Sequence, residues 1–135
     1  MRFIIAFLLP NEKPLGSLKS FHMHELSIVL NIIEIANDEL HKHQAQIVEA
    51  IELEVGELAG IEFTALDFAW NAAVEHTILQ NAVRTISRIE GKARCSNCGN
   101  EFGVFQRYEP CPVCGEVFNE IISGQELKVK SLILS

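Results

Sequence analysis

The sequence lacks an apolar run long enough to cross a bilayer. The longest, Phe3 to Leu9, ends at Pro10, far short of the roughly 20 residues that a spanning helix needs. Basic residues are also few. Eleven Lys and Arg face eighteen Asp and Glu, a net charge of −7, which argues against nucleic acid or an anionic membrane as the main partner. No nucleophile–base set and no phosphate-binding loop is recognisable, so an enzyme is the least favoured class.

What the sequence does contain is enough apolar surface for one folded domain. Hydrophobic residues make up 48% of the 135 residues, and charged residues 21%. These are ordinary values for a globular protein. A disordered chain would bury too little apolar surface to fold, so we expect a folded core with at most a small additional module.

The four cysteines form the most specific pattern. They occur as two C-x-x-C pairs, Cys95 with Cys98 and Cys111 with Cys114, and a glycine follows each pair. Two such turns can direct four sulfur atoms to one centre, and four thiolates suit a structural Zn(II) ion. Two separate redox pairs, four unconnected thiols, or iron in a rubredoxin-like electron-transfer site are the alternatives. Reduced, metal-bound cysteines indicate a cytoplasmic protein.

Apolar periodicity predicts an α+β fold. The expected order is helix 24–43, strand 47–55, helix 63–79, strand 82–90, the cysteine module and strand 127–134. The last strand is expected to return to the main sheet. The prediction is therefore two helices on a small, mainly three-stranded sheet, with an inserted zinc-ribbon module. Trp70 and the phenylalanines are expected in the core.

Residues 1–22 differ from the rest of the chain. They contain a short apolar stretch followed by Pro10 and Pro14. A poorly ordered tail, a misassigned start with Met23 as the initiator, and an extra packing strand are the alternatives, and an export signal is less favoured. This divides the chain into an N-terminal extension (1–22), an α/β domain (23–91 plus 119–135) and a zinc-binding domain (92–118).

A zinc ribbon can also serve as a nucleic-acid or transcription-type binding module. Such a module needs basic residues around its cysteine turns. Lys92, Arg94 and Arg107 are the basic residues near them, against four glutamates: Glu101, Glu109, Glu116 and Glu120. The charge balance therefore disfavours this alternative.

Several ordered motifs resemble the HypA/HybF family of nickel metallochaperones over residues 23–135. Besides the paired cysteines, they are Met23 to Ser27, Val55 to Ile61, Phe68-Ala69, Gly91 and Leu127 to Ser131. The resemblance implies a nickel-binding α/β domain with a zinc-ribbon insertion. It also implies a protein without catalysis of its own, which delivers Ni(II) during nickel-iron hydrogenase maturation. A GTPase for nickel insertion and the hydrogenase large subunit are the implied partners, in some organisms with urease maturation factors. The oligomeric state stays open, a homodimer included.

The resemblance places nickel at Met23, His24 and Glu25. By themselves, His24 is an exposed histidine at a helix start and Glu25 an acid that the helix dipole favours. In the family the histidine after the initiator Met is the indispensable ligand and the next Glu contributes. Ni(II) favours nitrogen donors, and a chain beginning at Met23 would offer an amine, backbone amides and an imidazole. In a chain beginning at Met1 the Met23 amine is not free, and His22 or amide nitrogens would have to replace it. His41, His43 and His76 are expected to be solvated or packed rather than metal ligands.

Overall fold

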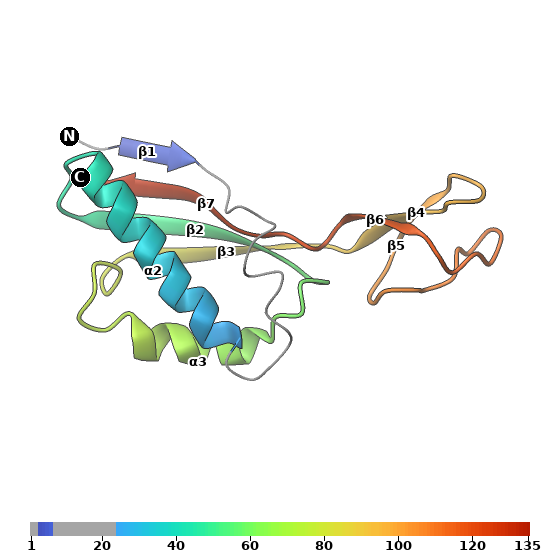
Figure 1. Ribbon diagram of the computed structural model, residues 1–135, viewed down its shortest axis with the longest axis horizontal. Helices are drawn as coiled ribbons and strands as arrows, with labels where there is room; N and C mark the ends of the chain where they lie inside the picture. Colours follow the sequence, from blue (N-terminus) through green and yellow to red (C-terminus); the bar gives the residue numbers. More distant parts are fainter. Residues whose placement is uncertain (1–2, 7–23) are drawn as a thin grey trace.

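The fold is an α/β body with a smaller β module at its far end. A computed structural model describes residues 3–6 and 24–135 (Figure 1). The elements are β1 (Phe3–Ala6), α2 (His24–Lys42), β2 (Val48–Gly56), α3 (Phe63–Ala73), β3 (Val83–Ile89), β4 (Lys92–Arg94), β5 (Glu101–Gly103), β6 (Glu120–Ser123) and β7 (Leu127–Leu134). None of the helices in these ranges is long and apolar enough to cross a membrane.

The main sheet has the strand order β1-β7-β2-β3. Strand β3 runs parallel to β2, as expected for two strands joined by a crossover helix, whereas β7 is antiparallel to both of its neighbours. The predicted α+β class is confirmed, and the last strand does return to the main sheet. The sheet has one strand beyond the three expected, since residues 3–6 pair with the outer edge of β7.

Both helices pack on one face of this sheet and form the core with it (Figure 1). The sequence of strand β2 explains why the helices cover only one face of the sheet. Ile51, Leu53 and Val55 are buried, while Glu52 and Glu54 alternate with them. Successive strand residues point to opposite faces. On the open face Glu54 pairs with Lys128 of β7 at 3.2 Å. The helices contribute the matching apolar stripe: Ile28, Val29, Ile32, Ala36, Leu40, Leu66, Ala69 and Trp70.

Helix α3 ends at Ala73, so the prediction of a helix extending to residue 79 is wrong. Beyond it the backbone turns, and His76 adopts the left-handed conformation with φ of 66°. The Thr77 hydroxyl donates to the carbonyl of Val74 at 2.6 Å. Such a side-chain bond offers the backbone an alternative to the helix. Val74 and Leu79 are nevertheless buried, which explains why the apolar pattern resembles a longer helix.

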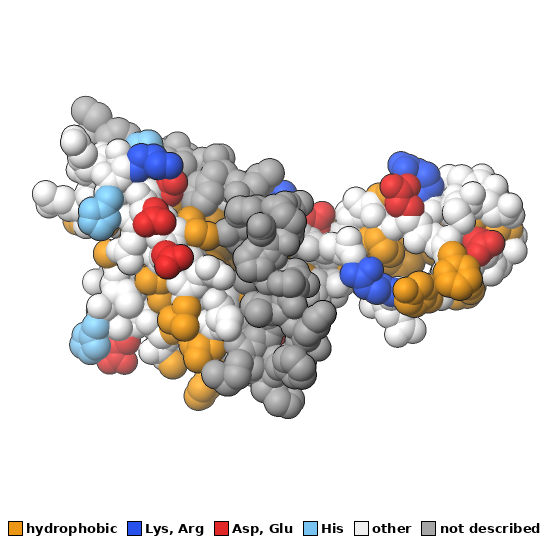
Figure 2. Space-filling model, viewed as in Figure 1, with side chains coloured by type: hydrophobic (Ala, Val, Ile, Leu, Met, Phe, Trp, Pro, Cys, Tyr) orange, Lys and Arg blue, Asp and Glu red, His pale blue; other side chains and the backbone are white. Residues whose placement is uncertain are grey.

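The expectation for the aromatic residues is half right. Trp70 is buried, but Phe68 on α3 and both Phe105 and Phe118 in the small module are exposed, by 77%, 88% and 70%. Phe68 lies beside, rather than on, the stripe that faces the sheet. The small module has too few residues to enclose large side chains. Figure 2 shows apolar side chains on the surface of both parts of the molecule.

The small module contains a second sheet, of order β5-β4-β6, inserted between β3 and β7. Glycines make the junction with the main sheet. A Cβ atom on Gly56 would lie 2.0 Å from the carbonyl oxygen of Gly124, and one on Gly124 would lie 2.6 Å from the Cα of Gly91. The Leu58 N–H donates to the Gly124 carbonyl at 2.6 Å. The two sheets are thus joined by backbone contacts that only glycine permits.

Candidate metal centres

The two cysteine turns of the small module have the same backbone structure. The N–H of Gly99 donates to the carbonyl of Cys95 at 3.0 Å, and the N–H of Gly115 donates to that of Cys111 at 2.8 Å. Both glycines have positive φ, 79° and 84°, which glycine adopts without strain. Each turn therefore places its two cysteines on one side.

Together the turns bring all four sulfur atoms to one point. The four Sγ atoms lie within 4.8 Å of one another, and no other group of three or more potential metal ligands gathers in the described part of the chain. The Cys95–Cys114 Sγ distance is 3.4 Å and the Cys98–Cys111 distance is 3.7 Å. A disulfide would need about 2.05 Å, whereas Zn–S bonds of about 2.3 Å place tetrahedral sulfurs roughly 3.8 Å apart. All four thiols are free, and their arrangement fits a tetrahedral ion.

Backbone N–H groups surround these sulfurs. Those of Asn97 and Cys98 each donate to Cys95 Sγ at 3.3 Å, and that of Val113 donates to Cys111 Sγ at 3.4 Å. Hydrogen bonds of this kind favour the thiolate, which is the metal-binding form. Cys95 and Cys111 are buried, whereas Cys98 and Cys114 lie at the surface.

The thiols differ in their acidity. Loss of solvent raises the pKa of Cys111, but hydrogen bonds from the Cys114 and Val113 backbone and from the neighbouring thiols outweigh it and lower the pKa to about 6. For Cys98 a backbone hydrogen bond involving Asn100 lowers the pKa, but desolvation and the other three thiols together raise it to about 11. Neighbouring thiols whose titrations interact show such a split. A divalent cation bound between the four sulfurs would replace their protons and offset the repulsion between neighbouring thiolates.

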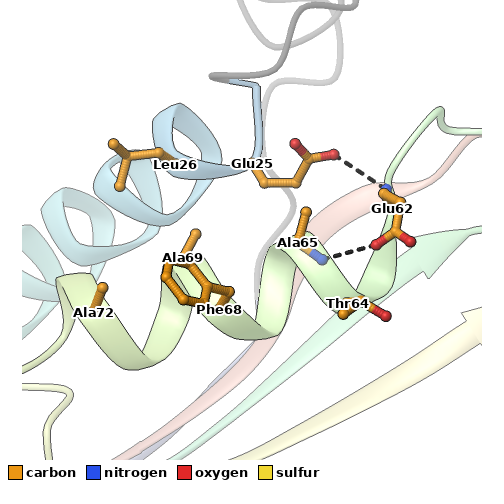
Figure 3. A pocket seen from close by; sticks show the side chains of 8 residues that line it. All are labelled: Glu25, Leu26, Glu62, Thr64, Ala65, Phe68, Ala69 and Ala72. Carbon is orange, nitrogen blue, oxygen red and sulfur yellow. Dashed lines mark hydrogen bonds between the residues drawn. The ribbon is translucent and has the colours of Figure 1, made fainter.

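The second candidate site, at Met23, His24 and Glu25, is described in part. Helix α2 begins at His24. Met23 and the alternative ligand His22 lie outside the described residues, and so does the side chain of His24. The Glu25 carboxylate is buried and points at the start of α3 (Figure 3), where its Oε2 accepts a hydrogen bond from the Glu62 N–H at 3.1 Å. No pattern in the sequence marks Glu62 as a neighbour of this motif.

An apolar groove of about 620 Å³ lies between α2 and α3 next to Glu25 (Figure 3). Its lining residues are Glu25, Leu26, Glu62, Thr64, Ala65, Phe68, Ala69 and Ala72. Sequence periodicity missed this groove because the exposed Phe68 was expected in the core.

The remaining histidines lie elsewhere and do not join a ligand cluster. Nδ1 of His41 is 2.8 Å from the carbonyl oxygen of Asn37, one turn back on the same helix. Nε2 of His43 lies 3.5 Å from a Glu39 oxygen, and that of His76 lies 3.5 Å from a Glu75 oxygen. These are local surface contacts.

Comparison with known proteins points to one family. The sequence model of the family described as hydrogenase/urease nickel incorporation, metallochaperone, hypA matches residues 23–134. The hydrogenase maturation factor HypA of Parabacteroides distasonis is 38% identical over 112 residues, which cover 83% of this chain and 97% of that protein. The HypA factor of Geobacter metallireducens is 37% identical over 110 residues, 82% of this chain and 97% of its own length.

Solved structures agree in fold. A solution structure of a HypA protein superposes with a TM-score of 0.62 at 23% identity, covering 84% of this chain and 97% of its own. The solution structure of the nickel metallochaperone HypA from Helicobacter pylori gives a TM-score of 0.58 at 23% identity, covering 80% and 94%. The overall fold is thus shared with these proteins.

Proposed function

The chain belongs to the HypA family of nickel-incorporation metallochaperones, and we propose that it binds one Ni(II) ion at the Met23-His24-Glu25 motif and delivers it to a hydrogenase under assembly. As a member of that family it is a hydrogenase maturation factor with a four-cysteine metal site, and not an enzyme. The observation that best supports the nickel site is that the family match begins at residue 23, the first residue of the motif.

The chemistry of these residues suits a cargo ion. The His24 imidazole, the backbone amides and, where it is free, the Met23 amine are the nitrogen donors that Ni(II) prefers. Helix α2 begins at His24, so the donors belong to the start of an element rather than to a closed cage. An ion held at such an edge can be passed to a second protein, whereas one enclosed on all sides is retained.

The resident ion that we propose for the cysteines is Zn(II), held by Cys95, Cys98, Cys111 and Cys114. The all-sulfur donor set and its tetrahedral spacing fit this ion. When bound, zinc supplies a cross-link that stabilises a module too small to form its own core. On this proposal 92–118 is the zinc-binding domain, and 23–91 with 119–135 is the nickel-binding domain. Strand β6, which pairs with β4 in the small sheet, begins at Glu120, just beyond residue 118.

The recipient that we propose is the large subunit of a nickel-iron hydrogenase, served together with a GTPase partner. The names of the relatives specify hydrogenase maturation, which favours hydrogenase over urease as the recipient.

Nickel binding is expected to weaken as the pH falls through about 6.5, the usual pKa of histidine. The imidazole must be neutral to bind the metal, so protons compete with Ni(II) below that pH. The test is calorimetric titration of the zinc-loaded chain with Ni(II) between pH 5.5 and 8, with zinc content measured in parallel as the control. A nickel affinity that does not change across this range would contradict a histidine-based site, and no binding at pH 8 would contradict the proposed function itself.

A further inference from the structure

Glu25 is the one buried charged residue among those whose burial the structure describes. Its side chain is 7% exposed, although it belongs to the first turn of α2, next to His24. A buried carboxylate without a partner would be costly. Its partner is the backbone of α3, because Oε2 lies 3.1 Å from the Glu62 nitrogen, as the dashed line in Figure 3 shows.

This hydrogen bond completes the capping of α3. Glu62 is the N-cap residue, and its own Oε1 accepts from the Ala65 N–H at 2.8 Å. In a capping box, the side chain of the third helical residue accepts a hydrogen bond from the N-cap N–H. Here the third residue is Ala65, which has no side chain able to do so. Glu25 of the other helix accepts that N–H instead, so a residue in the first turn of α2 caps the start of α3.

We propose that Glu25 is a positioning residue: by accepting the Glu62 N–H it fixes the first turn of α2, and with it His24, for nickel binding, without binding the ion itself. This inference rests on the proposed nickel function and deepens it. The Glu25 carboxylate points toward the start of α3 (Figure 3). The side chain of the next residue, Leu26, points away from that carboxylate. Were the carboxylate to turn to a metal, it would leave the Glu62 N–H without its acceptor.

The geometry favours positioning over ligation for a second reason. Glu25 sits where two helices begin, and both helix dipoles stabilise a carboxylate at that place. Imidazole nitrogen suits Ni(II) better than carboxylate oxygen does. Ni(II) would therefore gain little by drawing this carboxylate away from the Glu62 N–H. Partners that orient metal ligands typically contribute 10–100-fold in affinity, so an indirect role is enough to make Glu25 matter.

The first test compares Glu25→Gln with Glu25→Ala in the full, zinc-loaded chain. Glutamine keeps an oxygen acceptor of the same reach but loses the charge, so its Kd for Ni(II) should stay within about threefold of wild type, whereas alanine should weaken binding about tenfold or more. Glu34→Ala, which removes an exposed acid from the same helix, is the matched control and should leave the Kd unchanged. If glutamine loses as much affinity as alanine, the carboxylate is a ligand and the proposal fails.

The second test acts on the donor. Glu62→Pro removes the N–H that Glu25 accepts, while Glu62→Ala removes only the side-chain cap. The proline variant should weaken nickel binding as Glu25→Ala does, the alanine variant should not, and the double variant Glu25→Ala/Glu62→Pro should lose no more than either single one. Additive losses, or an unchanged Kd in the proline variant, would overturn the proposal.

A readout without nickel separates this inference from the function on which it rests. The Glu62 amide resonance should move on Glu25→Ala and stay in place on Glu25→Gln. If the Glu62 amide resonance does not move in Glu25→Ala, the contact is refuted, irrespective of the result of the nickel titrations. Absence of nickel binding by the wild-type chain would refute the nickel site, while the resonance shift would still report the contact.

Discussion

Replacing His24 by alanine is expected to abolish tight nickel binding while leaving zinc and the fold in place. The imidazole is the one side-chain nitrogen that the motif itself supplies. Loss of a residue that merely orients a ligand already costs 10–100-fold in metal affinity, so loss of the ligand should raise the Kd by more than about 100-fold. Calorimetric titration with Ni(II), with wild type and variant beginning at the same residue, measures this change.

The control for this variant is His41→Ala. His41 is an exposed histidine near the other end of α2, so its loss removes an imidazole from the same helix without touching the motif. Its nickel isotherm should match that of wild type. An unchanged isotherm for His24→Ala would remove His24 from the site.

Replacing any one of Cys95, Cys98, Cys111 or Cys114 by serine is expected to release zinc and unfold the small module. Structural zinc contributes about 10–16 kcal/mol of apparent binding energy in isolated finger peptides, far more than the few apolar contacts of this module can offer. Metal analysis after dialysis measures the zinc. Amide spectra should show loss of dispersion for β4, β5 and β6, while signals of β2 persist because its core partners lie in the main sheet.

Val113→Ser is the matched control for the cysteine variants. It introduces the same residue within the second cysteine turn, at a side chain that is 70% exposed, and should leave zinc at one ion per chain. Full zinc occupancy in all four cysteine variants would overturn the four-thiolate assignment.

The features that could be predicted from the sequence are those set by local pattern. Alternation along Ile51, Leu53 and Val55 indicated a strand with one buried face, and the structure buries all three. The spacing of the four cysteines likewise indicated one cluster, because two C-x-x-C turns can direct four sulfur atoms to one centre, and the four Sγ atoms do gather.

Two features could not be predicted from the sequence. One is the end of a helix, where turns compete with further helix, and the other is a contact between distant segments. The end of α3 at Ala73 was missed because Val74 and Leu79 stay buried in the turns that follow, which imitates helical periodicity. The contact of Glu25 with Glu62 joins residues 37 positions apart. No local pattern reveals that an acid in one helix caps another.

The two proposed metal centres differ in how far they enclose the ion, which suits retention of zinc and release of nickel. The zinc site has four donors within a few ångströms and two of them buried, an arrangement that leaves no open position and suits permanent retention. The nickel motif stands at the start of a helix, and the one donor neighbour that is described, Glu25, is held by protein contacts instead. One protein can therefore keep one ion and release the other.

The measurement that tests the central claim most directly is a Ni(II) titration of the zinc-loaded protein in two forms, one beginning at Met1 and one beginning at Met23. In the second form the Met23 amine is free to join the His24 imidazole and the backbone amides as a nickel ligand. The predicted result is one Ni(II) per chain in both forms, with a Kd at least about tenfold lower in the form beginning at Met23, a difference of roughly 1.4 kcal/mol. Failure of both forms to bind Ni(II) would contradict the nickel site and the delivery function built on it.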